Sequence, residues 1–169
     1  MAEALDPAIP KTVDDLVHQV LERACERELK LVTAESCTGG LLASLLTDIP
    51  GCSHAFERGF VTYSNEAKHE MLGVPDAVLR DPGPVSEPAA RAMAEGALRN
   101  SRGDLALSIT GYAEKDPESD KPAGLVHFAV AAAGAPTVHH KAEYGEVGRA
   151  EVRIRCLETG LKMMRTALG

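Results

Sequence analysis

The amino-acid sequence predicts an α/β fold, namely a three-layer α/β/α sandwich around a mixed, mostly parallel sheet of about five strands. The runs at 31–34, 105–109 and 125–132 are apolar at nearly every position, which is typical of strands buried on both faces. The segments between these runs carry apolar residues at helical spacing. Because 169 residues is the length of one domain, helices are expected on both sides of a single sheet.

The first half of the chain predicts two strands and three helices. Thr12 is interpreted as the N-cap of the first helix, because apolar residues follow at offsets 0, 3, 4, 7, 8 and 11 from Val13. Asp14 and Asp15 in its first turn favour the same helix start. The other elements expected here are a strand at 31–34, a helix at 41–46, a strand at 59–63 and a helix at 64–71.

The second half predicts three strands and two helices. Ser86 is the expected N-cap of a helix whose apolar face reaches Leu98, and it is followed by buried strands at 105–109 and 125–132. Apolar and polar side chains alternate from 137 to 144, as in an edge strand half exposed to water. The final expected element is an amphipathic helix over 150–168.

Such a sheet binds its ligands just beyond the carboxyl ends of its strands. The loops at those ends are 35–40, 63–68 and the segment from Thr110 onward. We therefore expect the functional residues in these three segments.

The composition narrows the classes of partner. With 18 basic and 25 acidic residues the formal net charge is −7, the wrong sign for attraction to a nucleic-acid backbone. A small phosphorylated ligand remains possible, because backbone N–H groups and one or two arginines bind phosphate locally. The N-terminus lacks the features of a leader, and no run of about 18 apolar residues occurs. These features predict a cytoplasmic protein that does not enter a membrane.

The cysteines and histidines do not predict a metal site. Cys25, Cys37, Cys52 and Cys156 form no C-x-x-C pair and no cluster with zinc-ligand spacing, so free thiols in a reducing compartment are expected. The six histidines are scattered, and the adjacent His139 and His140 would point to opposite faces of a strand.

The first candidate loop puts the Ser36 hydroxyl and the Cys37 thiol at a helix N-terminus, where free N–H groups favour an oxyanion or a phosphate. Gly39 and Gly40 allow a ligand to approach the backbone closely. A plain strand-to-helix turn has the same composition, and Cys37 also fits a small apolar core residue. Both interpretations stay open at this point.

The second candidate segment offers Tyr63, Ser64 and Lys68. A lysine acts as the base for a serine only when it is neutral, and burial lowers its pKa toward that state. The alternative is that Ser64 is an N-cap and Lys68 a solvated helix residue. Since 32 positions separate Ser36 from Lys68, only tertiary folding could bring the two together.

Several segments together carry a family resemblance: TAESCTGG at 33–40, VTYSNEAK at 61–68, MLGVP at 71–75, VSE at 85–87 and SITG at 108–111. From about residue 10 to its end the chain resembles the CinA C-terminal-domain family. The resemblance implies one such domain over 1–169, with 1–11 as a flexible N-terminal extension. It also implies nicotinamide-nucleotide amidohydrolase activity, in which a Ser/Lys mechanism without metal or cofactor hydrolyses nicotinamide mononucleotide to the acid and ammonia during pyridine nucleotide recycling.

Carried over residue by residue, the resemblance makes Ser36 the nucleophile, Lys68 its general base and Tyr63 a hydroxyl that assists proton transfer or orients the lysine. The backbone of the first loop would bind an oxyanion or a phosphate, and Arg149 would meet the phosphate of the ligand. Taken without the resemblance, Arg149 is also an ordinary surface residue of a helix. The implied substrate-binding residues are Cys37, Thr38, Gly39, Gly40, Thr110, Gly111 and Arg149.

One segment departs from the family pattern. The family has a glycine-rich Thr-Gly-Ile-Ala-Gly-Pro-x-Gly where this chain has TGYAEKDP at 110–117. The carboxylates of Glu114 and Asp116 would repel a phosphate if they faced the site. Two alternatives follow for the function of the chain: a nucleotide-binding homologue with impaired catalysis, and a regulatory protein.

We also expect the chain to form a homo-oligomer.

Overall fold

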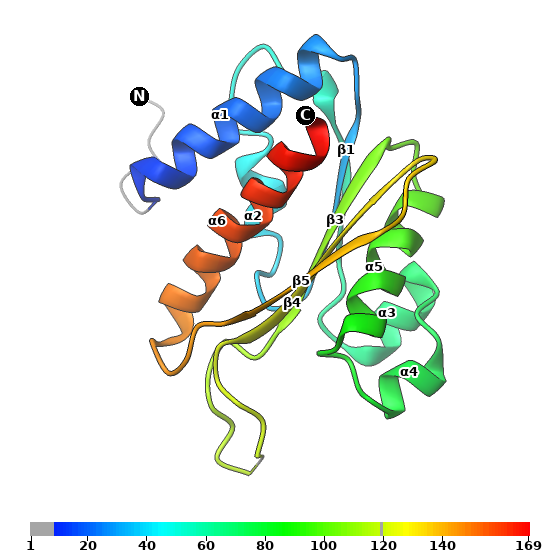
Figure 1. Cartoon of the computed structure of the whole chain (residues 1–169), viewed down its shortest axis with the longest axis vertical. Helices are drawn as coiled ribbons and strands as arrows, with labels where there is room; N and C mark the ends of the chain where they lie inside the picture. The colour runs from blue at the N-terminus through cyan, green and yellow to red at the C-terminus, as the bar shows by residue number, and fades with distance from the viewer. Residues whose placement is uncertain (1–8, 119) are drawn as a thin grey trace.

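A computed structural model of the chain describes residues 9–118 and 120–169. It is a three-layer sandwich (Figure 1), which confirms the predicted fold class. The five strands are β1 (Leu31–Glu35), β2 (Phe56–Val61), β3 (Leu105–Gly111), β4 (Leu125–Ala132) and β5 (Val138–Glu143). The helices are α1 (Lys11–Glu26), α2 (Leu41–Leu45), α3 (Asn65–Leu72), α4 (Asp76–Arg80), α5 (Glu87–Arg99) and α6 (Arg149–Leu168), and a short 3-10 helix, η2, covers Ser53–Ala55.

The sheet is mixed, with the strand order β2-β1-β3-β4-β5. β1 pairs in parallel with both β2 and β3, whereas β4 runs antiparallel to β3 and to β5. Because β5 is antiparallel to β4, it runs in the same direction as the three parallel strands. The carboxyl ends of β1, β2, β3 and β5 therefore lie at one edge of the sheet, and β5 is the expected edge strand.

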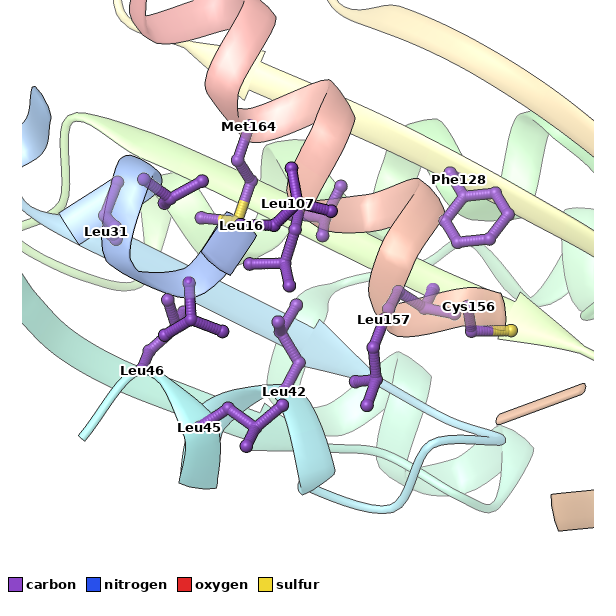
Figure 2. Close-up of a cluster of buried hydrophobic side chains, with 14 of the residues drawn as sticks. Leu16, Leu31, Leu42, Leu45, Leu46, Leu107, Phe128, Cys156, Leu157 and Met164 are labelled. Carbon is purple, nitrogen blue, oxygen red and sulfur yellow. The ribbon is translucent and has the colours of Figure 1, made fainter. Parts of the chain in front are cut away.

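The helices cover the two faces of the sheet separately. Figure 1 shows α1, α2 and α6 on one face and α3, α4 and α5 on the other. The larger core lies under α1, α2 and α6, and Figure 2 shows how leucines of these helices meet Leu31, Leu107 and Phe128 of the sheet. A second apolar cluster, which includes Val32 and Met93, packs α3, α4 and α5 against the opposite face. These two cores fix where the strand ends are placed.

Several predicted boundaries need correction. The N-cap of α1 is Pro10 and not Thr12, because the Pro10 carbonyl accepts the N–H of Val13 at 2.9 Å and so starts the helix earlier. β2 ends at Val61, opposite Glu35 at the end of β1, so the parallel ladder stops there. The sequence did not predict α4. Of the expected flexible extension at 1–11, residues 1–8 lie outside the described part of the chain and Lys11 already belongs to α1.

The prediction of four free thiols is wrong for two of them. A disulfide joins Cys25, near the end of α1, to Cys52, just before η2, with their Cα atoms 6.2 Å apart. The two positions are 27 residues apart in sequence and come together because α1 packs beside η2. Cys37 and Cys156 are free and buried.

Within residues 9–118 and 120–169, no helix combines the length and the apolar character that crossing a membrane requires.

Gly96 is the position in α5 where an added methyl group has the largest expected effect. A Cβ there would collide with the carbonyl of Leu72, the last residue of α3. We expect Gly96→Ala to lower the free energy of unfolding by about 1 to 3 kcal/mol, because the two helices would have to separate. In a helix without such a contact the same change stabilises by about 0.5 to 1 kcal/mol. A urea titration gives the sign, and a stabilised variant would contradict this packing.

Candidate active site

The three candidate loops meet at the edge where the parallel strands end. Glu35 at the end of β1 lies opposite Val61 of β2 and Ile109 of β3. Ser36 follows β1, Tyr63 follows β2 and Thr110 lies near the end of β3, and all three line one pocket.

The turn after β1 holds Ser36 in a fixed position. Its N–H donates to the carbonyl of Ile109 at 3.0 Å, and its own carbonyl accepts from Gly39 at 3.1 Å. Gly39 and Gly40 have φ of 61° and 93°, in the left-handed region that glycine adopts without strain. These positive φ angles are sufficient to account for glycine at both positions, and no contact with a ligand is needed to explain them. The Ser36 side chain is only 7% exposed.

Glu35 anchors the turn and was missed by the sequence reasoning. Its buried carboxylate accepts the N–H groups of Leu42 and Ala43, each at 2.9 Å, and so satisfies the free N-terminus of α2. An acidic residue at the end of an apolar strand, shortly before a helix start, is the signal that could have identified this cap.

We expect Glu35→Gln to lower the free energy of unfolding by about 1 to 3 kcal/mol, because one of the two N–H groups would face an amide NH2 instead of an acceptor. A urea titration measures the loss. Glu158→Gln is the matched control, since Glu158 is an exposed partner of Lys162 on α6 and its loss costs at most about 1 kcal/mol. An equal loss in both variants would contradict the anchoring role.

Lys68 is buried beneath the same turn. Its side chain, in the middle of α3, is 2% exposed, so the interpretation as a solvated helix residue is wrong. The Nζ atom lies 3.0 Å from Ser36 Oγ, 2.9 Å from the carbonyl oxygen of Thr62 and 3.4 Å from that of Tyr63. Burial lowers the pKa of Lys68, and the Cys37 thiol partly opposes this shift. Ser64 is confirmed as the N-cap of α3, because its Oγ accepts the N–H of Ala67 at 3.0 Å.

The partners of Lys68 determine what its amine can do. A neutral amine has two hydrogens and one lone pair, and the carbonyls of Thr62 and Tyr63 can accept both hydrogens. Ser36 Oγ is the third neighbour; a protonated Lys68 donates to it, and a neutral Lys68 that donates to the two carbonyls would have its lone pair left for the Ser36 proton. This arrangement allows Lys68 to take the proton of Ser36.

The residues after Ser36 supply hydrogen-bond donors. Among the described residues, no backbone carbonyl accepts the N–H of Cys37 or Thr38. Cys37 lines the pocket, whereas Thr38 is fully buried and does not. The Thr38 hydroxyl is buried and has no partner there either. Arg153 Nη2 donates to the Thr38 carbonyl at 3.2 Å and supports the loop from below. The sequence reasoning missed this role, although Arg149 and Arg153 are four residues apart and share a helix face.

Arg149 lies at the start of α6 and links two of the loops. One guanidinium nitrogen donates to the Tyr63 hydroxyl at 3.2 Å and the other to Glu114 Oε1 at 3.0 Å. The hydrogen bond to Tyr63 and the charge of Glu114 raise the pKa of Arg149. The Tyr63 ring is 65% exposed, and its hydroxyl contacts Arg149, whereas its backbone carbonyl is the group that meets Lys68.

Thr110 and Gly111 form the wall at the end of β3. The Thr110 hydroxyl donates to the carbonyl of Pro84 at 2.8 Å, which ties the strand to the loop before α5. A Cβ at Gly111 would press against Val126 and the Leu125 carbonyl of β4. Close strand packing therefore explains the glycine.

Together these residues enclose a pocket of about 230 Å³. A larger hollow of about 610 Å³ lies between β5 and α6, but its described lining contains no serine and no cysteine. The lining of the smaller pocket is Ser36, Cys37, Tyr63, Asn65, Lys68, Pro84, Val85, Thr110, Gly111, Tyr112, Ala113 and Arg149.

Cys37 faces a different environment from Ser36. Its side chain joins the core under α1 and α6, as expected for successive residues that point to opposite sides. A hydrogen bond with Cys156 lowers the pKa of Cys37 and raises that of Cys156. Lys68 forms its hydrogen bond with Ser36 and, among the described residues, none with Cys37.

In the described part of the chain, no three histidine, cysteine or carboxylate side chains gather in a way that could hold a metal ion. Two histidines on the adjacent strands β4 and β5 are in contact, with His127 Nδ1 and His139 Nε2 2.9 Å apart. Burial lowers the pKa of both.

Sequence comparisons with known proteins all find relatives of the same family. The model of the CinA C-terminal domain matches residues 13–168. The nicotinamide-nucleotide amidohydrolase PncC of Escherichia coli is 52% identical over 119 residues, which is 70% of this chain and 72% of that protein. A competence-damage inducible protein of Symbiobacterium thermophilum is 56% identical over 110 residues, which is 64% of this chain and 26% of that protein. The chain spans about a quarter of the length of such longer relatives.

Solved structures agree with the sequence comparison. The competence/damage inducible protein CihA of Agrobacterium tumefaciens has a TM-score of 0.90 and 43% identity, covering 95% of this chain and 97% of that one. A CinA superfamily protein of Klebsiella pneumoniae has a TM-score of 0.86 and 30% identity, covering 92% and 97%.

Proposed function

Because the chain belongs to the CinA C-terminal domain family, we propose that it hydrolyses the carboxamide of nicotinamide mononucleotide to nicotinic acid mononucleotide and ammonia. The observation that carries the proposal is the 3.0 Å contact between the Ser36 hydroxyl and the buried Lys68 amine. The similarity to the Escherichia coli amidohydrolase supports the choice of substrate.

The first half of the reaction forms an ester. Ser36 Oγ attacks the carboxamide carbon while its proton moves to Lys68 Nζ. The negative charge that develops on the carboxamide oxygen is stabilised by the N–H group of Cys37, which lines the pocket. The C–N bond then breaks, the nitrogen takes the proton back from Lys68, and ammonia leaves.

The second half releases the acid. Water attacks the ester carbon while Lys68 accepts one of its protons, and the same N–H group stabilises the second tetrahedral intermediate. The bond to Ser36 Oγ breaks, and the serine recovers its proton from Lys68. Each step uses only this chain's own residues and water, so the proposed reaction involves no metal or cofactor.

The outer part of the pocket would hold the rest of the substrate. Arg149 and the Tyr63 hydroxyl lie at its mouth and offer hydrogen bonds to a ribose or a phosphate. The alternatives without catalysis are less favoured, because the altered segment after Thr110 leaves the contact between Ser36 and Lys68 intact. Recycling of pyridine nucleotides in the cytoplasm, by a homo-oligomer, would be the physiological setting.

The test is product analysis after incubation with nicotinamide mononucleotide. We expect ammonia and nicotinic acid mononucleotide in equal amounts. Release of free nicotinamide would indicate cleavage of the glycosidic bond instead, and ligand-induced thermal stabilisation without any product would indicate a binding protein. Either of these results would overturn the proposal.

A further inference from the structure

The protein places an anion of its own against Arg149, a residue of the pocket lining. Glu114 Oε1 lies 3.0 Å from the guanidinium of Arg149, and the two side chains are 62% and 44% exposed. Arg149 is also the first residue of the 20-residue helix α6, where free N–H groups favour negative charge. The Glu114 carboxylate therefore occupies the place where an anionic group of a ligand would be attracted.

Other cations near the pocket are engaged elsewhere. Among the described residues that line it, Lys68 and Arg149 are the basic ones, and Lys68 must be neutral to act as a base. Lys115 pairs with Glu146 at 3.6 Å, and Arg153 donates to the Thr38 carbonyl. Lys121 Nζ lies over the ring of Tyr112, 5.1 Å from its centre. A phosphate at the mouth would thus depend on Arg149 and would have to displace Glu114.

Asp116, the second carboxylate of the altered segment, has a different partner from Glu114. Its Oδ1 accepts the N–H of Glu118 at 2.9 Å and forms a local turn. Neither carboxylate belongs to the pocket lining, and Glu114 reaches the pocket through Arg149, which does line it. The two carboxylates therefore have the same charge and lie two positions apart, but only Glu114 meets Arg149.

We propose that Glu114 is a specificity residue that disfavours a substrate phosphate at the mouth of the pocket and shifts the preference toward the nucleoside form of the nicotinamide substrate. The inference rests on the proposed amide hydrolysis and names the substrate class that the same site selects. The nucleoside carries a positively charged pyridinium ring and no phosphate. It needs no cation at the mouth, and the Glu114 charge attracts it.

The size of the effect follows from the charges. A phosphate with up to two negative charges, about 5 Å from a carboxylate in water, is disfavoured roughly tenfold. Mobile ions screen such exposed groups, so the discrimination should shrink as the salt concentration rises. For the nucleoside the same carboxylate has a small effect of opposite sign.

The experiment compares Glu114→Gln with Asp116→Asn as a matched control for the loss of one negative charge from the same segment. The measured quantity is kcat/KM for nicotinamide mononucleotide and for nicotinamide riboside, at low and high ionic strength. We expect Glu114→Gln to raise the value for the nucleotide by about tenfold at low salt, mainly through KM, and the value for the riboside to change less than about twofold. Asp116→Asn should change either value less than about twofold.

The same two substitutions in a Ser36→Ala background separate this inference from the proposed function. Calorimetric binding of nicotinamide mononucleotide should tighten by about tenfold with Glu114→Gln, whether or not the native protein hydrolyses it. The specificity role of Glu114 is wrong if the nucleotide binds no better to Glu114→Gln than to Asp116→Asn. It is also wrong if Glu114→Gln raises the affinity for the nucleotide and for the riboside equally. If the native protein hydrolyses neither substrate, the proposed function fails, and the calorimetry still decides the role of Glu114.

Discussion

Ser36→Ala is expected to lower kcat for nicotinamide mononucleotide by at least about a thousandfold while the protein stays folded. The physical reason is that no other hydroxyl contacts the Lys68 amine among the described residues. The substitution removes one oxygen at the edge of the pocket and leaves the Glu35 anchor of the turn unchanged. Ammonia release measures the rate, and a urea titration shows that the fold persists.

Ser64→Ala is the matched control for this serine. Ser64 caps α3 only four positions before Lys68, so its loss should cost about 0.5 to 2 kcal/mol of stability. We expect it to retain most of the activity. If Ser64→Ala abolishes turnover and Ser36→Ala does not, the nucleophile has been assigned to the wrong serine.

Lys68→Met is expected to lower kcat by several orders of magnitude, because methionine cannot accept a proton. Lys68→Arg should be equally inactive, since a guanidinium stays protonated at working pH. An active Lys68→Arg variant would contradict the role of the lysine as a base. The measurement is the rate of ammonia release over a range of pH.

The lowered pKa of Lys68 predicts how the reaction rate and the stability change with pH. Burial lowers the pKa of Lys68 below 10.5, and the amine acts only when neutral, so the rate should rise with pH through that lowered pKa. The same shift means that the unfolded chain binds more protons than the folded one between the lowered pKa and 10.5. Keeping Lys68 buried therefore costs stability at neutral pH, and this cost disappears as the pH rises through that range. Lys68→Met removes this cost but leaves the carbonyls of Thr62 and Tyr63 without their donor. A urea titration of the variant therefore separates lost catalysis from lost folding.

The sequence was most informative about which loops form the site. Continuous apolar runs identified β1, β3 and β4, and the rule that ligands bind beyond strand carboxyl ends selected the segments around Ser36, Lys68 and Thr110. The sequence did not predict that Lys68 is buried, because α3 has few apolar residues of its own. Helix α3 is covered through packing against α5, which a local pattern does not reveal. The contact with Ser36 depends on the register between β1 and β2, which spacing does not determine.

Contacts between distant polar residues were the least predictable part. Glu35 and Arg153 both hold the turn after β1 by hydrogen bonds, and each contact depends on where a helix lies relative to the sheet. The pair formed by Glu114 and Arg149 brings together the loop after β3 and the start of α6. The Cys25–Cys52 disulfide likewise needs the packing of α1 beside η2.

The central claim is that Ser36 forms an ester with the substrate acyl group, and a partition experiment tests it most directly. Hydroxylamine competes with water for an acyl-enzyme, and the ratio of hydroxamate to acid does not depend on the group that has already left. Nicotinamide mononucleotide and the methyl ester of the corresponding acid should therefore give the same ratio with the native protein, and Ser36→Ala should give no hydroxamate from the amide. Different ratios for the two substrates would show that they share no acyl-enzyme and would contradict the role of Ser36.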